Sequence, residues 1–285
     1  MIRTVLWAVA LAAASLAWLS PSGASALERI PFTEDGGLIK VQGTVDGEPA
    51  PMLIDLGAGL NVLSERLGSR TVNVDGKYVT LSLTGQRVDV PIGTVVSIAL
   101  GEFGVDNRIV GIWKGLDGTG VDGLISATAF SNVTATFDYR AHELSIEDAV
   151  TFADRKRFAV RVPLFLQDEL GIALGVFARF NFGNGQSGLC VIDTGLPGVT
   201  VDRRFAKKLG INLEGQPRTH TKLGDGVAAT IPELTLADDP DATLKRPSVV
   251  FEDLVYDCNV GNQFWDDKTF TLDIPHRVMY VAPPA

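Results

Sequence analysis

The sequence is poor in the residues that bind metals or cross-link small folds. Its 285 residues include only two Cys and three His. These numbers exclude a structural zinc framework and a fold held together by several disulfides. Asp and Glu (34) outnumber Lys and Arg (25), so the net charge is −9. Because binding to phosphates needs a basic surface, we do not expect nucleic acid as a partner.

Long hydrophobic runs are also scarce, and the one present lies at the N-terminus. Residues 4–19 are apolar, follow a positively charged start, and precede the small residues Ala24-Ser25-Ala26. This three-part pattern predicts a signal peptide over residues 1–26. An uncleaved anchor is the alternative, but the run is shorter than the roughly 20 residues of a membrane-spanning helix. We therefore expect an exported protein, periplasmic or secreted, with no membrane span after cleavage.

The rest of the chain indicates a mostly β fold. Short segments rich in Val, Ile, Leu and Thr alternate with Gly-containing turns, as in residues 38–45 and 133–137. Helical patterns are few. The clearest covers residues 202–209 and is followed by Gly210, and its counterpart covers residues 64–67.

The mature chain carries one pattern twice. An apolar strand leads into Asp-x-Gly at Asp55 and again at Asp193, 138 residues later. A closing strand of each copy contains Asp138 or Asp273, 135 residues apart, which we interpret as turn or surface residues. Two further pairs of segments match, residues 29–32 with 161–164 and residues 61–64 with 199–202. Such similar offsets indicate an internal duplication.

The duplication predicts two lobes. The copies cover residues 27–150 and 155–285, and the boundary falls within the charged segment 147–157. A pseudo-twofold axis would bring the two Asp-x-Gly loops face to face. Carboxyl groups at such short range share one proton. The ionised member can then take a proton from water while the other donates to a carbonyl oxygen, which is metal-free amide hydrolysis.

These motifs resemble the aspartic proteases of the pepsin and retropepsin group, and most closely the exported bacterial proteins with two fused lobes. Residues 191–195 match the apolar-apolar-Asp-Thr-Gly motif of the family. Residues 259–264 and 124–130 match its later apolar-apolar-Gly motif, and both copies then run 12 residues to the closing Asp. The resemblance implies two β-barrel lobes with a cleft between them.

The resemblance also implies a function. Asp55 and Asp193 would be the catalytic pair of an endopeptidase, supported by Gly57, Thr194 and Gly195. The substrate would be a peptide or protein, and no cofactor or metal is implied. The alternative is a weak or inactive member that binds peptide or another ligand in the cleft. Oligomeric state is not predicted.

Two residues of the first lobe depart from the family pattern. Leu56 replaces the Thr or Ser whose hydroxyl would bond across to the other lobe, and this favours the inactive alternative. Ser126 replaces a Gly, unless Gly123 takes that part. Neither change removes a carboxylate.

The family places a β-hairpin flap over its cleft. The candidate tips here contain Gly85 in the first lobe and Gly224 with Asp225 in the second, with ordinary turns as the alternative. We expect the large residues Trp113, Phe130 and Trp265 to lie in the core.

The two cysteines hold equivalent positions in the motifs. Cys190 stands three residues before Asp193, and Cys258 three residues before Gly261. In the family fold these strands run side by side, so the resemblance implies a disulfide. Two buried free thiols are the alternative.

Overall fold

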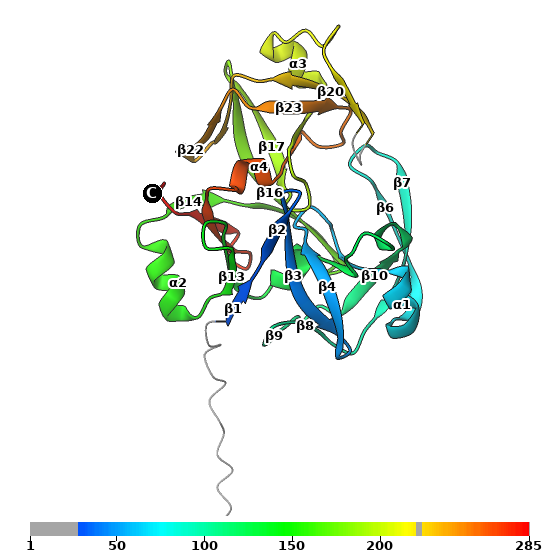
Figure 1. The fold of residues 1–285 in the computed structure, drawn as a ribbon. Coiled ribbons are helices and arrows are strands. Elements are labelled where there is room, and N and C mark those ends of the chain that lie inside the picture. Colours follow the sequence, from blue (N-terminus) through cyan, green and yellow to red (C-terminus); the bar gives the residue numbers. More distant parts are fainter. Residues whose placement is uncertain (1–27, 221–223, 285) are drawn as a thin grey trace, which may run out of the picture.

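The structure, a computed structural model, describes residues 28–220 and 224–284. The predicted signal peptide, residues 1–26, lies outside the described residues. The fold is mostly β, as predicted, and consists of two lobes joined by a shared sheet (Figure 1).

Each lobe contains a ten-stranded sheet within the described ranges. The first comprises β2 (Thr33–Asp35), β3 (Leu38–Val45), β4 (Glu48–Ile54), β5 (Asn61–Ser64), β6 (Asn73–Leu81), β7 (Arg87–Thr94), β8 (Ile98–Leu100), β9 (Phe103–Gly104), β10 (Ile109–Trp113) and β11 (Gly123–Ile125). The second comprises β15 (Phe165–Glu169), β16 (Ala173–Gly183), β17 (Gln186–Ile192), β18 (Val199–Asp202), β19 (Arg218–His220), β20 (Asp225–Thr230), β21 (Glu233–Leu236), β22 (Asp239–Lys245), β23 (Ser248–Glu252) and β24 (Cys258–Val260).

The two sheets share one topology. The order β7-β10-β5-β11-β4-β3-β8 in the first lobe corresponds to β20-β23-β18-β24-β17-β16-β21 in the second. Parallel pairs occur at equivalent places, β4 with β11 and β17 with β24. The strands that precede the two Asp-x-Gly loops are therefore equivalent elements of the two lobes.

A six-stranded sheet joins the lobes. Its order is β1-β13-β12-β25-β26-β14, so the central pair β12 and β25 comes from different lobes. The Phe137 and Phe270 rings stack there with centroids 4.9 Å apart. The strands are β1 (Glu28–Pro31), β12 (Thr134–Asp138), β13 (Glu143–Ile146), β14 (Val160–Pro163), β25 (Thr269–Asp273) and β26 (Val278–Val281).

Helices are short and lie between strands. They are α1 (Glu65–Thr71), the 3-10 turns η1 (Lys114–Leu116) and η2 (Ala127–Phe130), α2 (Ala149–Lys156), α3 (Arg204–Leu209) and α4 (Asn262–Trp265). α1 begins after Ser64, whose hydroxyl accepts the Leu67 N–H, and continues past the predicted end to Thr71. α3 begins two residues later than predicted because Asp202 still belongs to β18, and it ends at Gly210 in the left-handed region. α2 lies in the charged segment between the lobes.

Two sequence interpretations were wrong in part. Phe130 and Trp265 are fully buried, but Trp113 is 49% exposed at the end of β10, where the strand leaves the sheet for η1. Asp273 is buried rather than on the surface, because the turn between β25 and β26 folds His276 back onto its carboxylate. Asp138 is half-buried and accepts the Ala141 N–H in the equivalent turn.

Candidate active site

Each candidate aspartate follows directly after a buried strand with a parallel neighbour. The N–H of Asp55 donates to the Ile125 carbonyl at the end of β11 (2.8 Å). The N–H of Asp193 donates to the Val260 carbonyl at the end of β24 (3.0 Å). Because β4 and β17 are fixed in register with these neighbours, the two aspartates follow their strands at equivalent positions in the two sheets.

Each loop turns back and donates hydrogen bonds to its own aspartate. The Ala58 N–H donates to Asp55 Oδ1 (2.9 Å), and the Gly195 N–H donates to Asp193 Oδ1 (3.1 Å). Such N–H donors favour a carboxylate over a neutral carboxyl group.

The two loops approach each other so closely that each glycine contacts the opposite aspartate. A Cβ atom on Gly57 would lie 2.3 Å from Asp193 Cγ, and one on Gly195 would lie 2.2 Å from Asp55 Cγ. Only a residue without a side chain fits at either position. The contacts are reciprocal, so the two carboxyl groups face each other across the junction of the lobes.

Asp193 is 5% exposed, and the pKa of its carboxyl group is raised well above its ordinary value. Burial is the largest cause, and the like charge of Asp55 is the second, while the Gly195 N–H and the Asn259 side chain oppose the rise. The Asp193 side chain is also hydrogen-bonded to that of Asp55. Two carboxyl groups that bond each other must hold a proton between them, so they titrate as a pair.

Thr194 connects the two aspartate loops. Its hydroxyl accepts the Leu56 N–H (3.0 Å) and donates to the Ile54 carbonyl (2.8 Å), both in the other lobe. Leu56 makes no reciprocal side-chain bond, because a leucine side chain has no polar atom; it is fully buried in the core instead. The cross-lobe connection expected from the family therefore exists in one direction.

Ser126 is accommodated through a polar neighbour. It is fully buried, and its N–H and hydroxyl both point at Asn61 Oδ1 (2.9 and 3.2 Å). Its counterpart Gly261 has no such room, since a Cβ atom there would lie 2.1 Å from the Leu196 carbonyl oxygen. Gly123 is not packed as tightly as Gly261, because a Cβ atom on Gly123 would lie 3.3 Å from its nearest neighbours.

The β6–β7 hairpin reaches the second lobe. Gly85 lies at its tip with φ +81°, and the neighbouring Leu83 carbonyl accepts the Val255 N–H (2.9 Å). The Tyr78 hydroxyl on β6 donates to the Glu169 carboxylate on β15. Burial, and then this bond, raise the pKa of Tyr78 to about 12. The hairpin thus spans the junction between the lobes.

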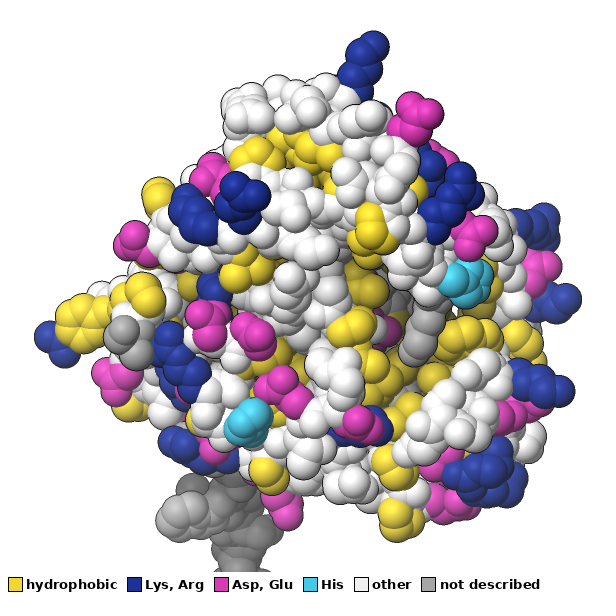
Figure 2. All heavy atoms as spheres, turned by 45° about the horizontal axis from the view of Figure 1, so that its top comes forward, with side chains coloured by type: hydrophobic (Ala, Val, Ile, Leu, Met, Phe, Trp, Pro, Cys, Tyr) yellow, Lys and Arg dark blue, Asp and Glu magenta, His cyan; other side chains and the backbone are white. Residues whose placement is uncertain are grey.

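A cavity of about 210 Å³ lies beneath this hairpin. It is lined by Gly57, Gly59, Leu60, Tyr78, Thr80, Leu81, Ser82, Leu83, Gln167, Glu169, Ala173, Gly175, Phe177 and Tyr256. Gly57 belongs to the first aspartate loop, so the cavity adjoins the carboxyl pair. Its lining comes from both lobes, as a site for an extended ligand between them requires. In Figure 2, hydrophobic side chains surround the hollowed centre of the molecule, and acidic and basic side chains are interspersed elsewhere on that face.

The second-lobe hairpin candidate is described only in part. Gly224 and Asp225 stand where the chain enters β20, and neither lines the cavity beneath the first hairpin. The Asp225 carboxylate is exposed and contacts the His220 imidazole (2.8 Å). Residues 222–223 of this predicted tip lie outside the described residues.

Cys190 and Cys258 form a disulfide bond in the structure. They are direct register partners on β17 and β24, with Cα atoms 4.6 Å apart. The bond therefore ties the strand that carries Asp193 to the strand that supports its loop.

Three residues at the site were missed by the sequence interpretation. Asn259 donates to Asp193, and Tyr78 and Glu169 close the hairpin over the cavity. A signal for Asn259 was present, because a polar residue there interrupts a motif that is otherwise apolar. Tyr78 and Glu169 carried no such signal, since they are 91 residues apart and meet only across the lobes.

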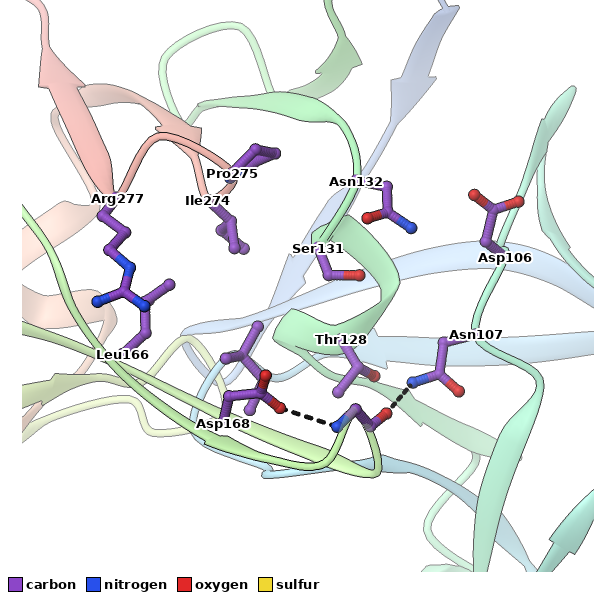
Figure 3. Close-up of a pocket in the computed structure, with 12 residues that line it drawn as sticks. Asp106, Asn107, Thr128, Ser131, Asn132, Leu166, Asp168, Ile274, Pro275 and Arg277 are labelled. Atoms are coloured by element: carbon purple, nitrogen blue, oxygen red, sulfur yellow. Dashed lines mark hydrogen bonds between the residues drawn. The ribbon is translucent and has the colours of Figure 1, made fainter.

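A second cavity, of about 540 Å³, lies at another part of the lobe junction (Figure 3). Asn107 of the first lobe donates to the Gly171 carbonyl at its edge (2.9 Å), and Asp168 accepts the Gly171 N–H (2.8 Å). Neither candidate aspartate lines it. Among residues 28–220 and 224–284, no three His, Cys, Asp or Glu side chains are grouped so as to hold a metal ion. The same ranges contain no helix of the length and hydrophobicity needed to cross a membrane.

Known proteins share this architecture. Residues 41–129 match the family model described as aspartyl protease. The aspartic proteinase from Irpex lacteus aligns over 91% of this chain and 98% of its own, with a TM-score of 0.55 and 14% identity. Basic 7S globulin from soybean aligns over 90% and 94%, with a TM-score of 0.51 and 12% identity. No curated protein matches the chain. The chain thus has the two-lobed fold of these solved proteins, and residues 41–129 of its first lobe are similar to the aspartyl protease family.

Proposed function

We propose that this protein is an exported aspartic endopeptidase in which Asp55 and Asp193 activate a water molecule. The observation that supports this most strongly is the reciprocal contact of Gly57 with Asp193 and of Gly195 with Asp55. That arrangement brings two carboxyl groups together at a cavity lined by both lobes.

The chemistry needs one proton on the pair. The ionised carboxylate takes a proton from water as the water oxygen bonds to the substrate carbonyl carbon. The protonated carboxyl group donates its proton to the carbonyl oxygen, which forms a tetrahedral diol. A proton then passes to the amide nitrogen, the C–N bond breaks, and a diol hydroxyl returns its proton to the pair. Burial of Asp193 supports this proposal, because burial favours retention of the shared proton.

Cleavage of an unstructured protein in acid tests the proposal. Activity should peak where the pair carries one proton, and Asp55→Asn and Asp193→Asn should each lower the rate by at least about 100-fold. Correct folding of each variant is checked by its melting temperature. An Asp55→Asn variant that cleaves at the wild-type rate would rule out the two-carboxyl mechanism.

The export part of the proposal rests on the N-terminal pattern and on the disulfide. Disulfides persist in oxidising compartments, and Cys190–Cys258 would be stable after export. N-terminal sequencing of the mature protein should start at Leu27, and recovery of an intact Met1 would contradict cleavage at this position.

A second function, peptide binding without efficient cleavage, is favoured by the closed hairpin and by Leu56. The Leu83–Val255 and Tyr78–Glu169 bonds both cross the path that a substrate would take. A peptide with a hydroxyl group in place of the scissile carbonyl distinguishes the two functions. Tight binding without turnover of the parent peptide would support the binding protein, and turnover would support the enzyme.

A further inference from the structure

Asn259 contacts the Asp193 carboxyl group from the strand next to β17. It lies on β24, is fully buried, and its side-chain Nδ2 donates to Asp193 Oδ2 (3.1 Å). The Gly195 N–H donates to the other oxygen, Oδ1 (3.1 Å). Both oxygens of the Asp193 carboxyl group therefore have a donor whose position is set by the fold.

The position equivalent to Asn259 in the first lobe is occupied by Leu124. Asn259 is the register partner of Val191, two residues before Asp193, and Leu124 is the partner of Leu53, two residues before Asp55. Leu124 has no side-chain donor and packs in an apolar cluster. The asparagine therefore makes the two halves of the pair chemically different.

The position is costly for an amide. Asn259 Oδ1 is buried and has no hydrogen-bond partner within the described residues. A buried polar atom without a partner opposes folding, and Leu124 shows that an apolar residue fits the equivalent place. The strand is also anchored next to Asn259 by the Cys258 disulfide. A group that costs stability and is held rigidly against one carboxyl is suited to a role at the site.

We propose that Asn259 is a positioning residue, which holds the Asp193 carboxyl toward Asp55, favours its ionised form, and so sets the acid limit of activity. This inference rests on the proposed function for its catalytic part. Its physical basis is that an N–H donor stabilises a carboxylate more than a neutral carboxyl. Loss of the donor must raise the pH at which the pair gives up its first proton.

Few other titratable groups act on Asp193. Within the described ranges these are Asp55, from the loop after β4, and Tyr139, which follows β12. The pKa of Tyr139 is raised well above its ordinary value, mainly by burial, so its hydroxyl stays neutral in acid and at neutral pH. A change in a titration midpoint that is observed in acid therefore reports on the carboxyl pair.

The test is Asn259→Leu, which introduces the residue of the other lobe. The acid limb of the kcat/KM profile, and the 13C carboxyl titration of Asp193, should both move up by about one pH unit. Val191→Ala is the matched control, because it removes volume from the paired strand without touching the carboxyl. It should lower the melting temperature and leave both pH midpoints unchanged. Unchanged midpoints in folded Asn259→Leu would overturn the inference.

A measurement on the unmodified protein covers the case in which the variant does not fold. The side-chain NH2 resonances of Asn259 should shift over the pH range in which the Asp193 carboxyl titrates, and their constancy would overturn the inference. Neither NMR titration needs turnover. A protein that cleaves nothing but shows these shifts would contradict the proposed endopeptidase and retain the Asn259–Asp193 coupling.

Discussion

Thr194 links both aspartate loops through a single hydroxyl group. The Leu56 N–H and the Ile54 carbonyl are backbone groups of the first lobe, yet their partner is a side chain of the second. Both ends of this bridge are buried, so water cannot replace the hydroxyl. A family-like loop would have a second hydroxyl at position 56, where here the leucine adds apolar packing instead.

Replacement of Thr194 tests how much this bridge contributes. Thr194→Val keeps the shape and leaves two buried backbone groups unpaired, so we expect a loss of about 2–4 kcal/mol in the free energy of unfolding. Thr194→Ser, which keeps the hydroxyl, is the control and should lose less than half as much. Denaturant unfolding measures both. An equal loss in the two variants would mean that the methyl group contributes as much as the hydroxyl, and would contradict a dominant role of the bridge.

At the scale of elements, the β6–β7 hairpin is fastened to the second lobe at two points. One is the Tyr78–Glu169 bond, and the other is the backbone bond from Val255 to Leu83. In the proposed function, an extended ligand would enter the cavity beneath these two bonds. Because the pKa of Tyr78 is raised to about 12, its hydroxyl remains a donor at any pH at which the protein would act.

Tyr78→Phe should loosen the hairpin. It removes one bond to a carboxylate, so the Val255 N–H should exchange with solvent up to about 10-fold faster. Amide hydrogen exchange measures this directly. Tyr280→Phe is the control, since Tyr280 lies on β26 in the shared sheet, away from the hairpin. Equal exchange at Val255 in wild type and Tyr78→Phe would show that the backbone bond alone holds the hairpin shut.

At the scale of the whole molecule, the carboxyl pair opposes the stability of the fold that holds it. The pKa of Asp193 is raised in the folded state, chiefly by burial and then by the charge of Asp55. Proton linkage gives the direction of the effect on the free energy of unfolding. Because folding favours the neutral form of Asp193, the protonated carboxyl group contributes stability in acid. That stability is lost as the pH rises from the pKa of the unfolded chain, near 4, through the higher pKa of the folded protein. Above the pKa of the unfolded chain, the folded protein must either bind a proton that the unfolded chain gives up or carry a buried charge, and either lowers its stability.

Asp193→Asn should therefore stabilise the protein while abolishing activity. The gain in melting temperature over wild type should be small near pH 3.5 and larger at pH 7, corresponding to about 1–3 kcal/mol. Asp75→Asn, at an exposed carboxylate, is the control and should show no such pH-dependent gain. A gain that is the same at both pH values would contradict the buried-charge explanation.

Much of this molecule was determined by short stretches of sequence. Short segments rich in Val, Ile, Leu and Thr, separated by Gly-containing turns, predicted the mostly β fold. The duplicated Asp-x-Gly loops and the cysteines at equal offsets were readable because a duplication repeats local patterns at a nearly constant spacing. Ser64 and Gly210 marked helix ends, since caps are made by near neighbours in the chain.

Only the tertiary structure decided how the lobes meet. The resemblance implied that a Thr hydroxyl bonds to the other lobe, as Thr194 does, whereas Tyr78 reaches Glu169 across 91 residues with no signal in the sequence. Asn259 reaches Asp193 because β17 and β24 pair in one particular register. Such contacts depend on the packing of whole sheets, and no local spacing encodes them. The sequence by itself therefore determined which groups are available for chemistry, and the packing of the two lobes decided which of them act on one another.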